Sequence, residues 1–204
     1  ELLIDVQDRF PDVSLTDMLT RSLKDLAGVL GGTTSAEPWF EDAKLPEDIQ
    51  CDVRVSGTSF GKVLVTGATG FLGGNVINRL LKTTDAVVIA LVRGKKGRER
   101  LLDSLSQHAE WQADWEARIE AVAGDLSLPR LGLEPALYDR LSKELDGIFH
   151  VAAMVNWVYP YRALSDANVA GTQALLRLAC LGATPFVYVS TSAVCWSFGA
   201  TGVF

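Results

Sequence analysis

The sequence predicts an α/β fold, a Rossmann-type doubly wound parallel sheet that is preceded by a small all-α segment. Apolar, β-branched stretches recur along residues 61–204 and alternate with stretches of helical periodicity. These apolar stretches are continuous, which is typical of parallel strands that are covered by helices on both faces. A glycine-rich turn joins the first strand to the first helix, as nucleotide-binding folds require.

Residues 1–31 are expected to form three short amphipathic helices. The first places Leu2, Val6 and Phe10 on one face, and the second begins at Ser14, which suits a helix cap. Together the three helices offer too little apolar surface to bury a core. We therefore expect further helical structure upstream of them.

Residues 32–60 are predicted to be a linker because they are rich in glycine, serine, threonine, proline and acidic residues. Its aromatic side chains, Trp39 and Phe40, are candidates for docking. Residues 1–60 carry 12 acidic and 5 basic side chains, whereas residues 61–204 carry 13 acidic and 14 basic side chains. This asymmetry predicts two units with different partners.

The remainder of the chain is expected to alternate strands with helices. The expected strands are residues 62–66, 86–92, 119–123, 147–152 and 185–190. The expected helices lie near residues 70–82, 97–117, 134–145 and 163–182. Right-handed crossovers then bring the carboxyl ends of the strands to one edge of the sheet, where such folds bind their ligands.

Composition argues against several classes of protein. The longest apolar run, residues 86–92, is too short to span a membrane, and we find no signal peptide, so we expect a cytoplasmic location. No basic stripe with interleaved aromatic residues is present, so we expect no nucleic-acid partner. Cys51, Cys180 and Cys195 are odd in number and widely spaced. We therefore expect reduced thiols and no metal site.

The turn after the first strand carries the candidate phosphate-binding residues. In the run GATGFLG, Gly67 permits a tight turn, Gly70 lets the backbone approach a pyrophosphate, and Gly73 lets the helix pack close to the strand. Backbone N–H groups at the helix start would face the phosphates. A glycine turn without a ligand is the alternative, which the following strands and helices disfavour. The predicted dinucleotide contacts here are Thr66, Gly67, Thr69, Gly70, Phe71, Leu72 and Gly73.

Arg93 lies at the end of the second expected strand, where the adenosine ribose of a dinucleotide would lie. An acidic residue there would bind the 2′-hydroxyl of NAD, whereas an arginine suits the 2′-phosphate of NADP. No Asp or Glu occurs within residues 91–97, and Lys95, Lys96 and Arg98 add positive charge. We therefore expect NADP(H), although a solvated basic loop also explains the three later side chains.

Further candidate contacts follow the third and fourth strands. Asp125, which precedes Leu126, is placed to accept a hydrogen bond from the adenine amino group, unless it is only a turn residue. Ala152 and Ala153 leave room for the cofactor because their side chains are small. The histidine before this pair, His150, is expected to be structural.

Two further polar positions are candidates near the reacting end of the cofactor. Asn168 lies in a mainly apolar helix, where we expect it to hold a water molecule or a backbone group. The run Ser190–Ser192 follows the fifth strand, where a hydroxyl can hydrogen-bond a carbonyl oxygen that gains negative charge. A helix cap is the alternative role for this run.

Several motifs occur together in the order that a known family shows. They are GATGFLG, LVRG, AGDLSLPRLGL, FHVAAMVNWVYPYRAL, ANVAGT and VYVSTSAV, which span about residues 62–195. With them the sequence resembles the extended short-chain dehydrogenase/reductases, and more narrowly the thioester reductase domains of nonribosomal peptide synthetases, aminoadipate reductases and carboxylic acid reductases. Residues 1–31 resemble the last helices of a peptidyl or acyl carrier domain. The resemblance thus divides the chain into a carrier fragment, a linker over residues 32–60 and an NADP-binding reductase part over residues 61–204.

The resemblance implies NADPH-dependent release of an acyl or peptidyl thioester as an aldehyde, with further reduction to the alcohol left open. The thioester would be tethered to phosphopantetheine on a carrier serine that precedes Glu1. Adenylation and carrier domains of the same polypeptide would be its partners. In this family a hydroxyl residue, a Tyr and a Lys form the catalytic set. Thr191 matches the hydroxyl position, and its neighbour Ser192 is less favoured.

The sequence departs from the family pattern at the Tyr-x-x-x-Lys pair. None of its four tyrosines has a lysine four residues later, so we expect this pair beyond Phe204. The fragment alone is then expected to bind cofactor without catalysing reduction. Alternatives are a redox-inactive relative that cyclises or releases a tethered chain, a non-redox NADP-binding module, and another extended short-chain reductase or epimerase. The carrier-like start of the chain disfavours the last two.

Overall fold

The computed structural model describes residues 39–51 and 59–191, and the helices expected within residues 1–31 lie outside these ranges. The described residues belong to two compact units. The smaller consists of residues 39–45 and 155–165, and the larger of residues 46–51, 59–154 and 166–191. The domain boundaries expected from the sequence stay predictions.

The larger unit is built on a parallel sheet that, among the described residues, has five strands in the order β3-β2-β1-β4-β5. The strands are β1 (Lys62–Thr66), β2 (Val87–Val92), β3 (Ile119–Ala123), β4 (Gly147–His150) and β5 (Phe186–Tyr188). The chain runs outward from β1 to β3 and then returns to the other side of β1. This reversal defines the doubly wound Rossmann arrangement, so the predicted fold class is confirmed.

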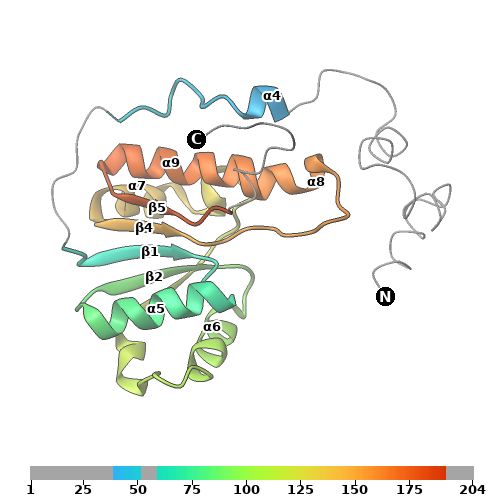
Figure 1. Cartoon of the computed structure of the whole chain (residues 1–204). Helices are drawn as coiled ribbons and strands as arrows, with labels where there is room; N and C mark the ends of the chain where they lie inside the picture. The colour runs from blue at the N-terminus through green and yellow to red at the C-terminus, as the bar shows by residue number, and fades with distance from the viewer. Residues whose placement is uncertain (1–38, 52–58, 192–204) are drawn as a thin grey trace, which may run out of the picture. The chain divides into compact units, whose positions relative to one another are not determined.

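Helices cover both faces of this sheet, as Figure 1 shows. One layer contains α5 (Phe71–Thr83) and α6 (Gly97–Ser106), and the other contains α7 (Pro135–Glu144) and α9 (Gly171–Gly182). Alternate residues of a strand point to opposite faces. Val63 and Val65 of β1 therefore pack in the first layer, and Leu64 packs in the second. All three are fully buried, which explains why the strand is apolar throughout.

The expected helix over residues 97–117 is wrong as a single element. It consists of α6, a turn, and a 3₁₀ helix, η1 (Ala113–Arg118). Leu105 is buried on α6, but Trp111 follows six residues later, a spacing that one helix face does not accommodate. Trp111 instead packs edge-to-face on Trp115, with ring centroids 6.0 Å apart.

The expected helix over residues 163–182 is also interrupted. The chain passes from α8 (Tyr161–Ser165) through a π-helical turn, η3 (Asp166–Ala170), before α9 begins. Such π turns are frequent at functional positions, and this one contains the candidate residue Asn168. A short 3₁₀ helix, η2 (Pro129–Gly132), follows β3.

The smaller unit contains α4 (Trp39–Asp42) and the segment of residues 155–165. The Tyr161 hydroxyl donates a hydrogen bond to Asp42 Oδ2 over 2.7 Å. Burial, together with this acidic partner, raises the pKa of Tyr161 to about 12. The predicted linker therefore contains one helical turn. In the ranges that the structure describes, no helix combines the length and the apolar character needed to cross a membrane.

Candidate functional site

A cleft of about 540 Å³ lies in the larger unit, among the loops that follow β1, β2, β3 and β4. The strand order reverses between β1 and β4, and doubly wound folds bind ligands at this point. The cleft brings together most of the predicted cofactor contacts. Those in its lining are Thr66, Gly67, Thr69, Gly70, Arg93, Asp125, Leu126, Ala152 and Ala153.

The glycine loop packs directly against the chain that follows β4. Gly67 has a φ angle of +70°, and a Cβ atom there would lie 2.7 Å from the backbone nitrogen of Ala152. A Cβ atom on Gly73 would lie 2.1 Å from the carbonyl oxygen of Gly67. Only glycine therefore fits at these two positions without a movement of the backbone.

Helix α5 begins at the cleft. Gly70 is its N-cap residue, and no side chain caps this end of the helix. The first turn contains no acidic residue, so no carboxylate competes for its backbone N–H groups or for the positive end of the helix dipole. This helix start suits an anionic ligand group such as a pyrophosphate.

Two arginines line the cleft where β2 ends. Arg93 directly follows β2, and Arg100 lies near the start of α6. The Arg100 guanidinium donates a hydrogen bond to the Arg93 carbonyl oxygen, which holds the two residues side by side. Arg98, in contrast, pairs with Glu116 over 2.9 Å and is outside the lining. Sequence reasoning misses Arg100, although a helix that starts directly after β2 must place its first turns at this edge.

Asp125 lines the cleft after β3. Its Oδ1 atom accepts hydrogen bonds from the Ser127 backbone N–H over 2.9 Å and from the Ser127 hydroxyl over 2.7 Å. These two bonds, and to a lesser extent the charge of Arg93, hold the pKa of Asp125 below its usual range. Asp125 is therefore ionised at neutral pH and is an acceptor for a donor such as an adenine amino group.

A buried chain of hydrogen bonds connects the glycine loop to the start of α9. Thr66 Oγ1 lies 2.7 Å from His150 Nδ1, and His150 Nε2 lies 2.9 Å from Thr172 Oγ1. The Thr172 hydroxyl donates to the Asn168 carbonyl oxygen over 2.6 Å, so it accepts from the N–H group at His150 Nε2. The other ring nitrogen then accepts from the Thr66 hydroxyl.

His150 is a neutral member of this chain. Only 1% of its surface is exposed, and burial lowers its pKa to about 4. The Thr66 hydroxyl oxygen also accepts the backbone N–H groups of Val151 and Ala152, each over 3.2 Å. His150 therefore supports the loop that lines the cleft, which agrees with the structural role expected for it.

Asn168 lies beside the cleft and outside its lining. Its Oδ1 atom accepts the Met154 N–H over 2.7 Å, and its Nδ2 atom donates to the Met154 carbonyl oxygen over 2.9 Å. Asn168 thus holds a backbone group of the loop after β4, which is one of the two roles expected for it.

The other predicted site residues lie outside the lining. Phe71 and Leu72 are exposed at the start of α5, and Thr191 is exposed after β5. Ser192 is outside the described residues. The functional roles of these residues stay predictions. Within the part of the chain that the structure describes, no group of three potential metal ligands occurs.

A family model described as male sterility protein, an NAD-binding family, matches residues 65–202. The chain belongs to this NAD-binding family. The match extends from the end of β1 past β5, so the NAD-binding family covers the loops and arginines that form the cleft.

Proteins similar to this chain within and around the NAD-binding family include reductases and peptide synthetases. Glycine betaine reductase of Emericella nidulans is 39% identical over 170 residues, 79% of this chain and 13% of that protein. The linear gramicidin synthase of Brevibacillus parabrevis is 44% identical over 172 residues, 78% of this chain and 3% of that protein.

Among solved structures, the terminal R domain from the myxalamid PKS-NRPS biosynthetic pathway is similar to this chain. It is 38% identical with a TM-score of 0.71, and the match covers 76% of this chain and 41% of that one. The chain therefore spans less than half the length of these relatives. The likeness to thioester reductase domains drawn from the sequence motifs is confirmed.

Proposed function

We propose that this chain binds NADP(H) and forms the dinucleotide-binding part of a reductase that releases a carrier-bound acyl or peptidyl thioester as an aldehyde. The proposal depends on one observation, the cleft in which the glycine loop and the start of α5 accompany Arg93 and Arg100. The reductases and peptide synthetases among similar proteins support the reaction class.

NADP(H) is favoured over NAD(H) by the charge at the end of β2. The 2′-phosphate of NADP would bind Arg93 and Arg100, whereas NAD offers a hydroxyl that an acidic residue would accept. No acidic residue occurs within residues 91–97. The remaining contacts also fit a dinucleotide, because Gly67 leaves space for a pyrophosphate and Asp125 is an ionised acceptor for adenine.

When bound, NADPH supplies the hydride that reduces the thioester carbonyl. In this proposal the Thr191 hydroxyl donates a hydrogen bond to the carbonyl oxygen as that oxygen gains negative charge. Ser192 is the less favoured donor. The Tyr and Lys of the family's catalytic pair are assigned to sequence that follows Phe204.

The proposed substrate is a thioester on the phosphopantetheine arm of a carrier domain, to which residues 1–31 are proposed to belong. The proposed partners are the adenylation and carrier domains of the same polypeptide, and the proposed location is the cytoplasm. The acidic surplus within residues 1–60 and the balanced charge of residues 61–204 support two units with different partners.

The proposal is tested on the complete protein that contains this chain, with NADPH and an acyl-pantetheine thioester. NADPH should be oxidised, and mass spectrometry should identify an aldehyde. Thr191→Val should lower turnover by about a hundredfold because the hydrogen bond to the developing oxyanion is lost. NADPH affinity, measured by fluorescence titration, should change by less than about twofold because the residue lies outside the cleft lining.

Thr191→Ser is the matched control because it keeps the hydroxyl, and it should retain most of the turnover. Unchanged turnover in Thr191→Val would remove this residue from the reaction. NADPH binding without oxidation would instead favour a redox-inactive cyclising domain or a non-redox NADP-binding module.

A further inference from the structure

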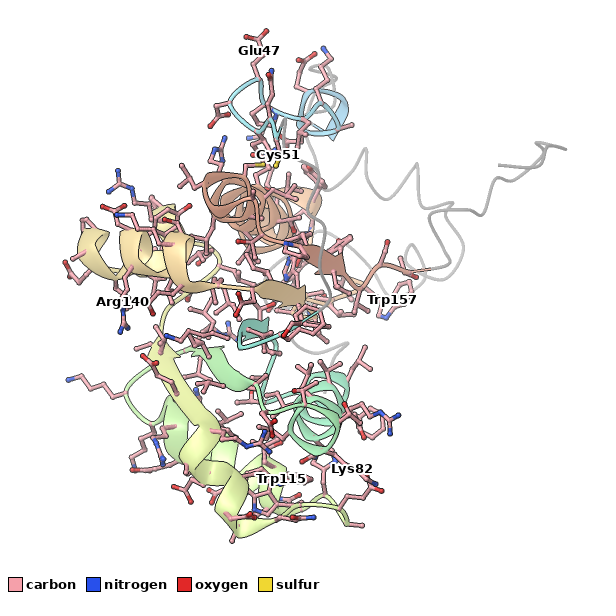
Figure 2. The ribbon with its side chains drawn as sticks, turned by 90° about the vertical axis from the view of Figure 1, so that its left-hand side faces the viewer. Glu47, Cys51, Lys82, Trp115, Arg140 and Trp157 are labelled. Carbon is pink, nitrogen blue, oxygen red and sulfur yellow. The ribbon has the colours of Figure 1, made fainter. Side chains whose placement is uncertain are left out.

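Two cysteine thiols that are far apart in the sequence lie together beside α9. Cys180 lies near the end of this helix, and Cys51 lies at the end of the segment of residues 46–51. The two thiols are in hydrogen-bonding contact. Figure 2 shows Cys51 next to the helix that carries Cys180. Both cysteines are reduced in the structure.

The segment of residues 46–51, here called the docking segment, is held on α9 by two further contacts. Asp48 accepts hydrogen bonds from Arg177, from Nε over 2.5 Å and from Nη2 over 3.1 Å. Arg177 lies three residues before Cys180, so the ion pair and the thiol pair share one side of the helix. Ile49 is only 5% exposed and anchors the segment between them. The thiols therefore meet in a fixed place.

The two thiols differ in accessibility. Cys51 is exposed, so a dissolved oxidant reaches it directly. Cys180 is half-buried, and burial raises the pKa of its thiol, as does the neighbouring cysteine. An exposed thiol beside a protected one is the arrangement in which the first reacts with an oxidant and the second resolves the product.

We propose that Cys51 and Cys180 form a reversible disulfide that locks the docking segment to α9 when the chain meets a disulfide oxidant such as oxidised glutathione. The Cys51 thiolate attacks one glutathione sulfur, the glutathione S–S bond breaks, and one glutathione thiolate leaves. The Cys180 thiolate then attacks the Cys51 sulfur, and the second glutathione thiolate leaves. Two cysteine thiols lose two electrons, which reduce the glutathione disulfide, and the two thiol protons pass to the released thiolates or to solvent.

The location of this bond determines its effect. The chain between Cys51 and Cys180 contains β1 to β4 and most of α9, so the disulfide closes a loop around most of the dinucleotide fold. A cross-link around a long loop restricts the unfolded chain strongly. Oxidation should therefore stabilise the larger unit, and reduction should leave the docking segment held by Asp48 and Ile49.

The test uses the 204-residue chain with Cys195→Ser, because trypsin would otherwise leave Cys180 and Cys195 in one peptide. After incubation with excess oxidised glutathione, trypsin digestion without a reductant should give peptide 45–54 linked to peptide 178–204. The linked species should be lighter than the two peptides together by two hydrogen atoms, and dithiothreitol should separate it. The oxidised chain should also unfold about 5 °C or more above the reduced chain.

Two further variants separate the proposal from adventitious oxidation. Cys180→Ser should give only a glutathione adduct on Cys51, with no linked peptide. Asp48→Asn weakens the contact with Arg177 and should slow disulfide formation several-fold. Recovery of both cysteines as alkylatable thiols after oxidation would overturn the proposal, and so would glutathione adducts as the only product in the Cys195→Ser chain. The unsubstituted chain, digested with chymotrypsin, provides the same readout should Cys195→Ser fold poorly.

Discussion

At the residue scale, two arginines determine the charge of the candidate site. Arg93 was accessible to sequence reasoning because it directly follows a clearly apolar strand. Arg100 was not, because its position beside Arg93 depends on how α6 leaves β2 and on the hydrogen bond from its guanidinium to the Arg93 carbonyl. Neither arginine has an ion-pair partner among the described residues, whereas Arg98 pairs with Glu116. This difference separates the cleft arginines from the solvated one.

Arg93→Glu should weaken NADPH about a hundredfold and NADH by no more than about threefold, because only NADPH carries the 2′-phosphate. Fluorescence titration with each cofactor measures both effects. Arg98→Glu is the matched control, since it changes the net charge equally but lies outside the cleft lining. Equal losses for the two cofactors in Arg93→Glu would contradict the assignment of the 2′-phosphate.

His150 gives the fold a dependence on pH. Burial lowers its pKa from 6.5 to about 4, so the unfolded chain binds more protons than the folded chain between these two values. Stability should therefore fall as the pH drops through this window, with no further loss from this group below about pH 4. The full loss is about 3 kcal/mol of unfolding free energy.

Urea unfolding of wild type and His150→Gln between pH 4 and 7.5 measures this contribution. The variant should be less stable at neutral pH because Thr66 and Thr172 lose a partner, and its stability should depend less on pH. His108→Gln is the control, since His108 is the other histidine of the chain, and it should keep the wild-type profile. Parallel profiles for wild type and His150→Gln would show that this histidine is not the titrating group.

At the scale of elements, the start of α5 and the glycine loop act as one structural unit. Gly73 brings the helix so close to the loop that a Cβ atom would overlap the Gly67 carbonyl oxygen. Gly74 differs, because a Cβ atom there would meet Nε2 of the His108 ring at 2.6 Å, a side-chain atom that can move away. Neighbouring glycines of one helix thus have different tolerance for a methyl group.

Gly73→Ala should lower NADPH affinity more than about tenfold and destabilise the chain by about 1–3 kcal/mol, because the backbone must shift to relieve the overlap. Gly74→Ala should change both quantities little, since its helix propensity improves while only a side chain must move. Cofactor titration and urea unfolding of the two variants provide the comparison. Similar behaviour of both variants would show that the close approach is unimportant.

The elements themselves were predictable to different degrees. Each strand is a buried apolar run, and such runs are visible in a sequence because both faces of the sheet are covered. The end of α6 was not predicted, since no glycine or proline marks it and the packing of Trp111 on Trp115 determines it. The π turn around Asn168 was missed for a similar reason, because its geometry accompanies the pair of hydrogen bonds to Met154.

At the scale of the larger unit, the reversal of strand order creates the site. Because β4 returns to the side of β1 opposite β2, the loops after four strands meet around one cleft (Figure 1). A ligand that fills this cleft contacts elements from distant parts of the chain. Binding should therefore stabilise the unit as a whole.

NADPH at a hundred times its dissociation constant should raise the unfolding free energy of the 204-residue chain by about 2.7 kcal/mol, because it binds only the folded state. For a chain of this size the midpoint of thermal unfolding should rise by about 5–10 °C. Differential scanning fluorimetry at increasing NADPH concentration checks this result. NADH at the same concentration should give a smaller shift, and no shift with NADPH would contradict binding in the cleft.

The sequence by itself determined the fold class, the positions of the strands, the glycine loop and Arg93. These features depend on local physics, namely apolar runs, the freedom of glycine and the residue that follows each strand. Tertiary structure alone decided the neighbour of Arg93, the partners of His150, the break after α6 and the meeting of Cys51 with Cys180. Each of these joins residues whose proximity depends on how helices pack on the sheet, and no local pattern in the sequence encodes that packing.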